Sequence, residues 1–107
     1  MDRLVRRAVL FDYYGELLNE KQKKIVGYTV TEDMSLSEIG EMEGITRQAA
    51  SVLLKRADER LEEFEKKLRI VEKTGTIRSC LDHIKQSDDI GYIRSQLTEI
   101  EAVIELN

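Results

Sequence analysis

Residues 35–57 read SLSEIGEMEGITRQAASVLLKRA, and this stretch predicts a helix-turn-helix. Ser35 is followed three residues later by Glu38, a pattern in which each side chain accepts a hydrogen bond from the other residue's backbone N–H at a helix start. Gly44 stands where the first helix must end in a left-handed residue, because glycine adopts a positive φ without a Cβ clash. Thr46 can cap the second helix through its hydroxyl. The spacing therefore predicts two helices joined at a glycine corner, within the length of a DNA-binding motif.

The apolar spacing of the second motif helix continues well beyond the motif. Apolar residues recur at alternating intervals of four and three, at Ala50, Leu54, Ala57, Leu61, Phe64, Leu68 and Val71. This pattern predicts one helix from Thr46 to about Lys73, roughly 40 Å long at about 1.5 Å per residue. Gly75, within Thr74-Gly75-Thr76, is expected to end it. An apolar stripe of this length must be buried against another surface. Four of its residues are therefore candidates for a core or for the seam of a dimer: Leu61, Phe64, Leu68 and Val71.

Two helices are predicted ahead of the motif. Residues 3–18 carry an apolar stripe at helical spacing, and Gly15 within that stripe predicts a close backbone crossing. Asn19 and Gln22 form a second capping pattern, which begins a helix that extends to about Val30.

Two shorter helices are predicted to follow the long one. The first carries Ile77, Cys80, Leu81 and Ile84, and the second follows a cap at Ser87-Asp88-Asp89 and repeats apolar residues at Ile90, Ile93, Leu97, Ile100 and Ile104. The expected fold is therefore all-α. We expect a single helical domain over residues 1–107, with an N-terminal bundle that holds the helix-turn-helix of residues 35–57. Residues 57–107 would form the long-helix extension, the two C-terminal helices and the dimerisation part.

The composition excludes several classes of protein. Of the 107 residues, 41% are hydrophobic and 36% are charged, with no proline, which is typical of a folded helical protein rather than a disordered one. No run of about 18 apolar residues is present, so no membrane insertion is expected. Asp12 interrupts the apolar start too early for a signal peptide. Cys80 is the single cysteine and cannot form an internal disulfide, which fits a cytoplasmic location.

The charge is unevenly distributed along the chain. The formal net charge of −4 counts against strong DNA binding, since affinity for duplex DNA rests largely on neutralising phosphates. Residues 46–57, however, contain three basic residues and no acidic one, whereas residues 70–107 contain four basic and seven acidic residues. The second motif helix is therefore a locally positive element in an acidic chain.

Six residues of that helix are candidates for nucleic-acid binding: Arg47, Gln48, Ser51, Val52, Lys55 and Arg56. Arg47 suits bidentate hydrogen bonding to guanine and Gln48 to adenine, while Val52 can contact a thymine methyl group. Ser51, Lys55 and Arg56 suit phosphate contacts.

Three more arginines, Arg3, Arg6 and Arg7, lie at the start of the first predicted helix. We expect them to form a solvated helix end, with contacts to the nucleic-acid backbone as the alternative.

Little in the sequence points to catalysis. Cys80 and His83 are the single residues of their kinds, three apart on one predicted helix, with no group to orient the histidine and no oxyanion site. Asp82 lies beside them, but the spacing matches no familiar metal-binding pattern. We therefore predict no catalytic residues, no metal site and no cofactor, and we interpret Cys80 as a core thiol.

The chain resembles the YlxM-like helix-turn-helix family of bacterial proteins, whose motif is similar to the promoter-recognising region 4 of sigma factors. The resemblance rests on Leu17–Gln22, on Ser35–Gly40, on Ile45-Thr46-Arg47-Gln48-Ala49 and on Lys55-Arg56. It covers nearly the whole chain, with its specific signal in residues 1–70. It implies a small all-helical protein with a regulatory role associated with the signal recognition particle pathway.

Two hypotheses of different classes follow. In the first, the protein is a homodimeric regulator that binds duplex DNA through Arg47 and Gln48. In the second, it is an adapter that binds protein or structured RNA of the signal recognition particle and keeps the helix-turn-helix as architecture. Val52 stands where the family usually has a polar residue, and this favours the second hypothesis.

Overall fold

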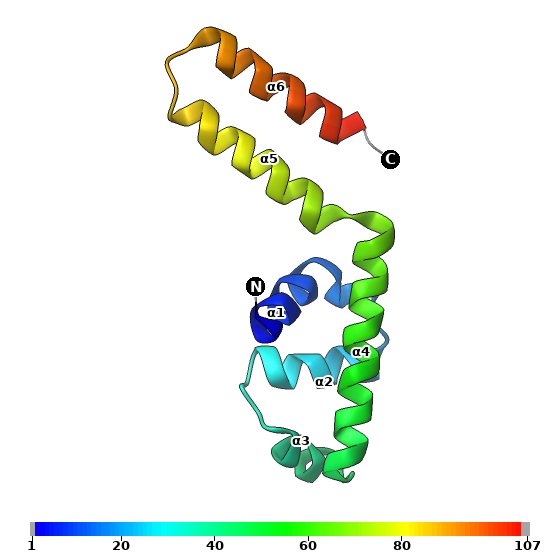
Figure 1. Ribbon diagram of the computed structural model, residues 1–107. Coiled ribbons are helices and arrows are strands. Elements are labelled where there is room, and N and C mark those ends of the chain that lie inside the picture. Colours follow the sequence, from blue (N-terminus) through cyan, green and yellow to red (C-terminus); the bar gives the residue numbers. More distant parts are fainter. Residues whose placement is uncertain (1, 106–107) are drawn as a thin grey trace. The chain divides into compact units, whose positions relative to one another are not determined.

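The computed structural model describes residues 2–105, which contain six α-helices and no β-strand, as the sequence predicts for an all-α protein. They form two compact units, one that extends to Leu68 and one that begins at Arg69. The first unit contains α1 (Arg3–Tyr14), the 3-10 turn η1 (Gly15–Leu17), α2 (Glu20–Val30), α3 (Leu36–Glu43) and α4 (Arg47–Leu68). The second contains α5 (Ile70–Lys85) and α6 (Ile90–Glu105) (Figure 1).

Helix α4 is the element around which the first unit is built. Helices α1, α2 and α3 all pack against it (Figure 1). The core between them consists of Leu10, Tyr14, Leu18, Ile25, Val26, Ile39, Ala50, Leu54, Ala57 and Leu61. Four of these belong to α4 and recur at intervals of four and three, so the sequence pattern correctly identified the buried side of this helix.

The helix starts expected from the sequence are confirmed. Asn19 and Gln22 form a capping box at the start of α2, and Ser35 and Glu38 form another at the start of α3. At the start of α4, the Ala49 N–H donates to Thr46 Oγ1 at 3.0 Å. These local bonds satisfy amides that a helix start leaves without partners.

The corner of the helix-turn-helix depends on two glycines. Gly44 ends α3 with φ of 68°, the left-handed conformation that the sequence predicts. The N–H groups of Gly44 and Ile45 both donate to the Gly40 carbonyl. A Cβ atom on Gly40 would lie 2.8 Å from the carbonyl oxygen of Ile45, so a larger residue would push α3 away from the turn.

The long helix ends earlier than the sequence predicts. Helix α4 stops at Leu68, and Arg69 adopts a left-handed conformation with φ of 56° before α5 begins. The expected end at Thr74-Gly75-Thr76 is wrong, because this segment lies inside α5. No glycine or proline marks the break, and the continuing apolar spacing conceals it.

Gly15 also departs from its predicted role. A Cβ atom there would lie 3.0 Å from ring atoms of Phe11, one turn earlier in the same segment, and this ring is its nearest neighbour. The close contact at Gly15 is therefore with a side chain and not with a crossing backbone.

The second unit is a hairpin of two antiparallel helices (Figure 1). Asp89 Oδ1 accepts hydrogen bonds from the N–H groups of Gly91 and Tyr92 at the start of α6, which confirms the predicted cap. Cys80 is the one residue of this unit that is buried among those the structure describes. None of the helices within residues 2–105 combines the length and apolar character needed to cross a membrane.

The close packing at Gly40 leads to a testable prediction about stability. We expect Gly40→Ala to lower the free energy of unfolding by roughly 1–3 kcal/mol, because the added methyl group overpacks the turn. Gly27→Ala is the matched control, since a Cβ there meets no atom within 4 Å and alanine should raise stability by about 0.5–1 kcal/mol through helix propensity. Urea unfolding of both variants measures the difference. Equal effects of the two substitutions would contradict the close packing at Gly40.

Candidate nucleic-acid interface

The six candidate residues lie together on the outer side of the first turns of α4. All six side chains are exposed: Arg47, Gln48, Ser51, Val52, Lys55 and Arg56. At about 100° per residue they cover one half of the helix circumference, and Ala50, Leu54 and Ala57 occupy the half that faces the core. The capped turn at Thr46 places this surface, hereafter the recognition face, at the very start of the helix.

The cations of the recognition face have no partners among the described residues. Within residues 2–105, no hydrogen bond or ion pair is made by the side chains of Arg47, Lys55 or Arg56. The next arginine along α4 behaves differently, since Arg60 pairs with Glu63 at 2.9 Å and lies over the ring of Phe64. Unpaired cations thus lie at the motif end of α4, and Lys66 and Lys67 in its last turn are exposed as well.

An arginine from α1 neutralises the carboxylate that follows the recognition face. Arg7 forms a bidentate ion pair with Asp58, at 2.7 Å and 2.8 Å, and is only 8% exposed. The hydrogen bond to Asp58 raises the pKa of Arg7, although burial acts in the opposite direction. Asp58 therefore offers little free negative charge beside Lys55.

A second pair repeats this arrangement one turn later. Arg6 contacts Glu62 through two hydrogen bonds of 2.8 Å and 3.0 Å. Hydrogen bonding to Arg6 lowers the pKa of Glu62 below the usual 4.5, and the same contact raises the pKa of Arg6. The expectation of a solvated helix end is therefore wrong for Arg6 and Arg7. Their partners lie more than fifty residues away, where no local spacing could reveal them.

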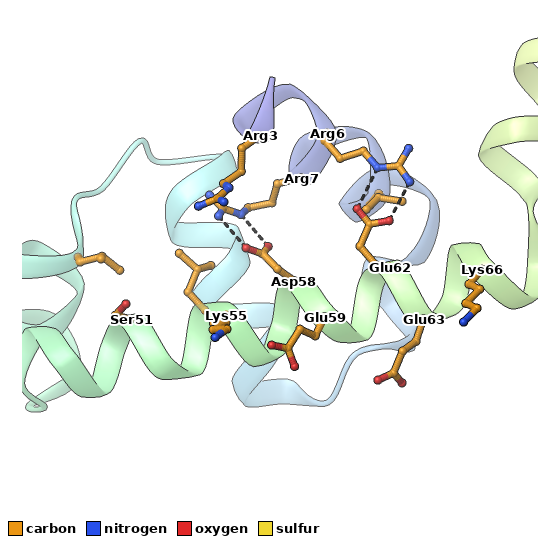
Figure 2. Close-up of a pocket in the computed structure, with 13 residues that line it drawn as sticks. Arg3, Arg6, Arg7, Ser51, Lys55, Asp58, Glu59, Glu62, Glu63 and Lys66 are labelled. Atoms are coloured by element: carbon orange, nitrogen blue, oxygen red, sulfur yellow. Dashed lines mark hydrogen bonds and ion pairs between the residues drawn. The ribbon is translucent and has the colours of Figure 1, made fainter. Parts of the chain in front are cut away.

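A groove of about 970 Å³ lies between α1 and α4. Arg3, Arg6 and Arg7 extend into it from α1, while Ser51, Lys55 and Asp58 belong to the α4 side (Figure 2). Ser51 and Lys55 lie at the end of the groove nearest the motif, and Lys66 lies at the other end (Figure 2). The groove is thus continuous with the recognition face.

The four seam candidates do not share one helix. Leu61 is fully buried in the first unit, and Phe64 packs beside Tyr14 with ring centroids 6.0 Å apart. Leu68 is half-exposed at the end of α4, and Val71 lies on α5 in the second unit. The core here also holds a polar contact that the heptad pattern missed, because the Tyr14 hydroxyl donates to the buried carboxylate of Glu65.

The two residues considered for catalysis, Cys80 and His83, differ in their exposure to solvent. Cys80 is buried, whereas His83 is exposed with Nδ1 at 3.2 Å from Gln96 Oε1. The described residues contain no cluster of three or more side chains suited to holding a metal ion.

Comparison with known proteins gives one consistent result. Residues 1–100 match the model of the UPF0122 family, described as "Putative helix-turn-helix protein, YlxM / p13 like". A UPF0122 protein of Thermoanaerobacter sp. is 39% identical over 104 residues, which cover 97% of this chain and 89% of the relative. One of Clostridium novyi is 40% identical over 93 residues, 86% of this chain and 81% of the relative. One of Shouchella clausii is 39% identical over 87 residues, which cover 81% of this chain and 80% of the relative.

The ion pairs between α1 and α4 generate a prediction. Arg7→Ala should lower the free energy of unfolding by about 2–4 kcal/mol, because it leaves Asp58 without its partner in a partly buried position. Arg6→Ala should cost less than about 1 kcal/mol, because Arg6 and Glu62 are both substantially exposed. Thermal unfolding of the two variants under the same conditions measures the contrast. A larger cost for Arg6→Ala would contradict it.

Proposed function

The chain belongs to the UPF0122 family of YlxM / p13-like helix-turn-helix proteins, and we propose that it is a regulatory protein that binds duplex DNA. The first three turns of α4 would enter the major groove, which is where the second helix of such a motif docks. One observation carries this proposal: a capped helix start presents exposed polar and cationic side chains that have no partners among the described residues.

Each residue of the recognition face has a chemical role in the proposed complex. Arg47 and Gln48 stand at the N-terminal end of the helix, where side chains reach base edges, and both can form bidentate contacts with purines. Val52 would contact a thymine methyl group. Ser51, Lys55 and Arg56 would donate to phosphates and position the helix in the groove.

The local charge supports this role despite the acidity of the whole chain. Each protein cation that contacts a phosphate releases counterions from DNA, and the local excess of unpaired cations decides how many such contacts form. Because Arg7 and Arg6 pair with Asp58 and Glu62, the two acidic residues on this flank of α4 repel a duplex less than their formal charges suggest.

We propose that two copies of the chain form a dimer through their second units. Ile90, Leu97 and Ile104 recur every seven residues along α6 and are 65%, 46% and 67% exposed. Residues 69–105 of this hairpin bury one side chain, that of Cys80, and a two-helix unit of this size is far too small to stabilise its own core, so we infer that another surface buries this apolar stripe. We propose that residues 57–107 form the dimerisation part, and a dimer would present two recognition faces to successive turns of DNA.

The alternative partner is protein or structured RNA of the signal recognition particle. One observation favours it: Val52 is 49% exposed in the middle of the recognition face, where an apolar side chain suits contact with protein. The resemblance described above associates this family with the signal recognition particle pathway.

Selection from a random duplex DNA library at near-physiological salt tests the DNA hypothesis. We expect the wild-type protein to enrich a sequence motif and the Arg47→Ala/Gln48→Ala variant to lose it, because each bidentate base contact contributes about 1–3 kcal/mol of discrimination. The matched control is Arg78→Ala/Gln86→Ala, which removes the same residue types from exposed positions outside the motif.

Recovery of the same unselected sequences by the wild-type protein and both variants would reject base recognition. Binding assays with the RNA and the GTPase of the signal recognition particle would then test the adapter hypothesis. A palindromic motif in the wild-type selection would support the dimer and give the spacing of its half-sites.

The dimer has its own test in solution. We expect the wild-type chain to elute with the mass of a dimer in size-exclusion chromatography with light scattering. Leu97→Glu/Ile104→Glu should give a monomer, because it buries two charges in the proposed interface. Ser95→Glu/Ala102→Glu adds the same charges at exposed positions on the other side of α6 and should stay dimeric. A monomeric wild-type protein would overturn the dimer.

A further inference from the structure

We propose that a phosphate of the DNA backbone binds between Arg3 of α1 and Lys55 of α4, at the end of the groove nearest the recognition face. This inference rests on the proposed DNA-binding function and adds a contact from α1, a helix outside the motif. It identifies Arg3, among the three N-terminal arginines, as the one that binds DNA.

The three arginines of α1 differ in their availability. Arg6 and Arg7 are each held by two hydrogen bonds to a carboxylate of α4. The side chain of Arg3 is exposed and makes no hydrogen bond or ion pair with any of the described residues. Only Arg3 can therefore bind an anion without first breaking an internal ion pair.

The charge balance of the groove leaves an excess of cations. The basic residues that line it are Arg3, Arg6, Arg7, Lys55 and Lys66. The acidic residues that line it are Asp58, Glu59, Glu62 and Glu63. Arg7 neutralises Asp58, Arg6 neutralises Glu62, and Glu63 pairs with Arg60. Three cations then remain against a single carboxylate, that of Glu59.

The remaining carboxylate, that of Glu59, lies one helical turn after Lys55 and away from Arg3. Figure 2 shows Glu59 and Glu63 on the side of α4 that faces away from α1, whereas Arg3 reaches from α1 toward α4. Lys55 and Ser51 line the groove close to the motif, one helical turn apart. A phosphate at this end would therefore meet a guanidinium, an ammonium group and a hydroxyl donor, against the single unpaired carboxylate of Glu59.

The position also fits the geometry of a helix in the major groove. The phosphate backbones run along both edges of the groove, so a helix that enters it carries phosphate contacts on its flanks. Helices α1 and α4 form the two walls of the groove, so Arg3 on α1 faces the side of α4 that bears Ser51 (Figure 2). It would hold the backbone on that side and carry no base information.

Salt-dependent DNA binding tests this inference. A labelled duplex carrying the selected motif is titrated with protein over a range of NaCl concentrations, and the logarithm of the binding constant is plotted against that of the salt concentration. For each chain bound, Arg3→Ala should weaken binding roughly fivefold at low salt and reduce the magnitude of the slope by about 0.9, which corresponds to one lost phosphate contact per chain. Its preference for the motif over a scrambled duplex should equal that of the wild-type protein.

Four controls make the result specific. Arg3→Lys keeps the charge and should keep the wild-type slope. Arg78→Ala removes an exposed arginine of the second unit and should bind like the wild-type protein. Inorganic phosphate at matched ionic strength should not displace the duplex, which distinguishes a backbone contact from a site for the free anion. Thermal unfolding should be the same for Arg3→Ala and the wild-type protein, since the Arg3 side chain is exposed and has no hydrogen bond or ion pair to lose among the described residues.

The outcomes separate this inference from the function on which it rests. If the wild-type protein binds the duplex and Arg3→Ala shows the same affinity and slope, the phosphate contact is wrong and the DNA-binding function stands. A changed sequence preference in Arg3→Ala would also overturn it, because the residue would then contact bases. Failure of the wild-type protein to bind any duplex would reject the proposed function and this contact together.

Discussion

The close approach of α3 to the turn before α4 is the constraint on which the first unit depends. Gly40 has no Cβ, and its carbonyl accepts hydrogen bonds from the N–H groups of both Gly44 and Ile45, so the chain turns from α3 into α4 within three residues. Helix α4 begins directly after this corner, with Ala50 against the core and Arg47 outward. A backbone contact that contains no functional side chain thus holds the start of the recognition face against α3.

The ion pairs between α1 and α4 combine structural and electrostatic roles. They join the first helix to the middle of the longest one, and they also neutralise Asp58 and Glu62 where these would weaken an anion-binding surface. An acidic protein can thereby keep a local cationic surface without a basic composition. For the DNA binding that we propose, the pairing of individual charges is therefore more informative than the net charge.

Features that depend on neighbours in the sequence could be predicted, and features that depend on docking could not. The capping boxes and the positive φ of Gly44 follow from residues three or four positions apart, and so does the exposure of the recognition face. The Arg7–Asp58 pair and the Tyr14–Glu65 hydrogen bond join residues 51 positions apart, and nothing in local spacing indicates them. The break at Arg69 escaped prediction for another reason. A left-handed arginine carries no sequence signal, and the apolar repeat continues across it.

The position of Arg3 on the groove wall has a practical consequence for anyone who prepares this protein. Polypeptide joined ahead of α1 would emerge beside the surface formed by Ser51 and Lys55, because Arg3 and these residues line the same groove. An affinity tag rich in histidine or acidic residues at that end would add its own charge, or cover the helix that we expect to enter DNA. Binding measured with an N-terminal fusion should therefore be repeated after the tag is removed.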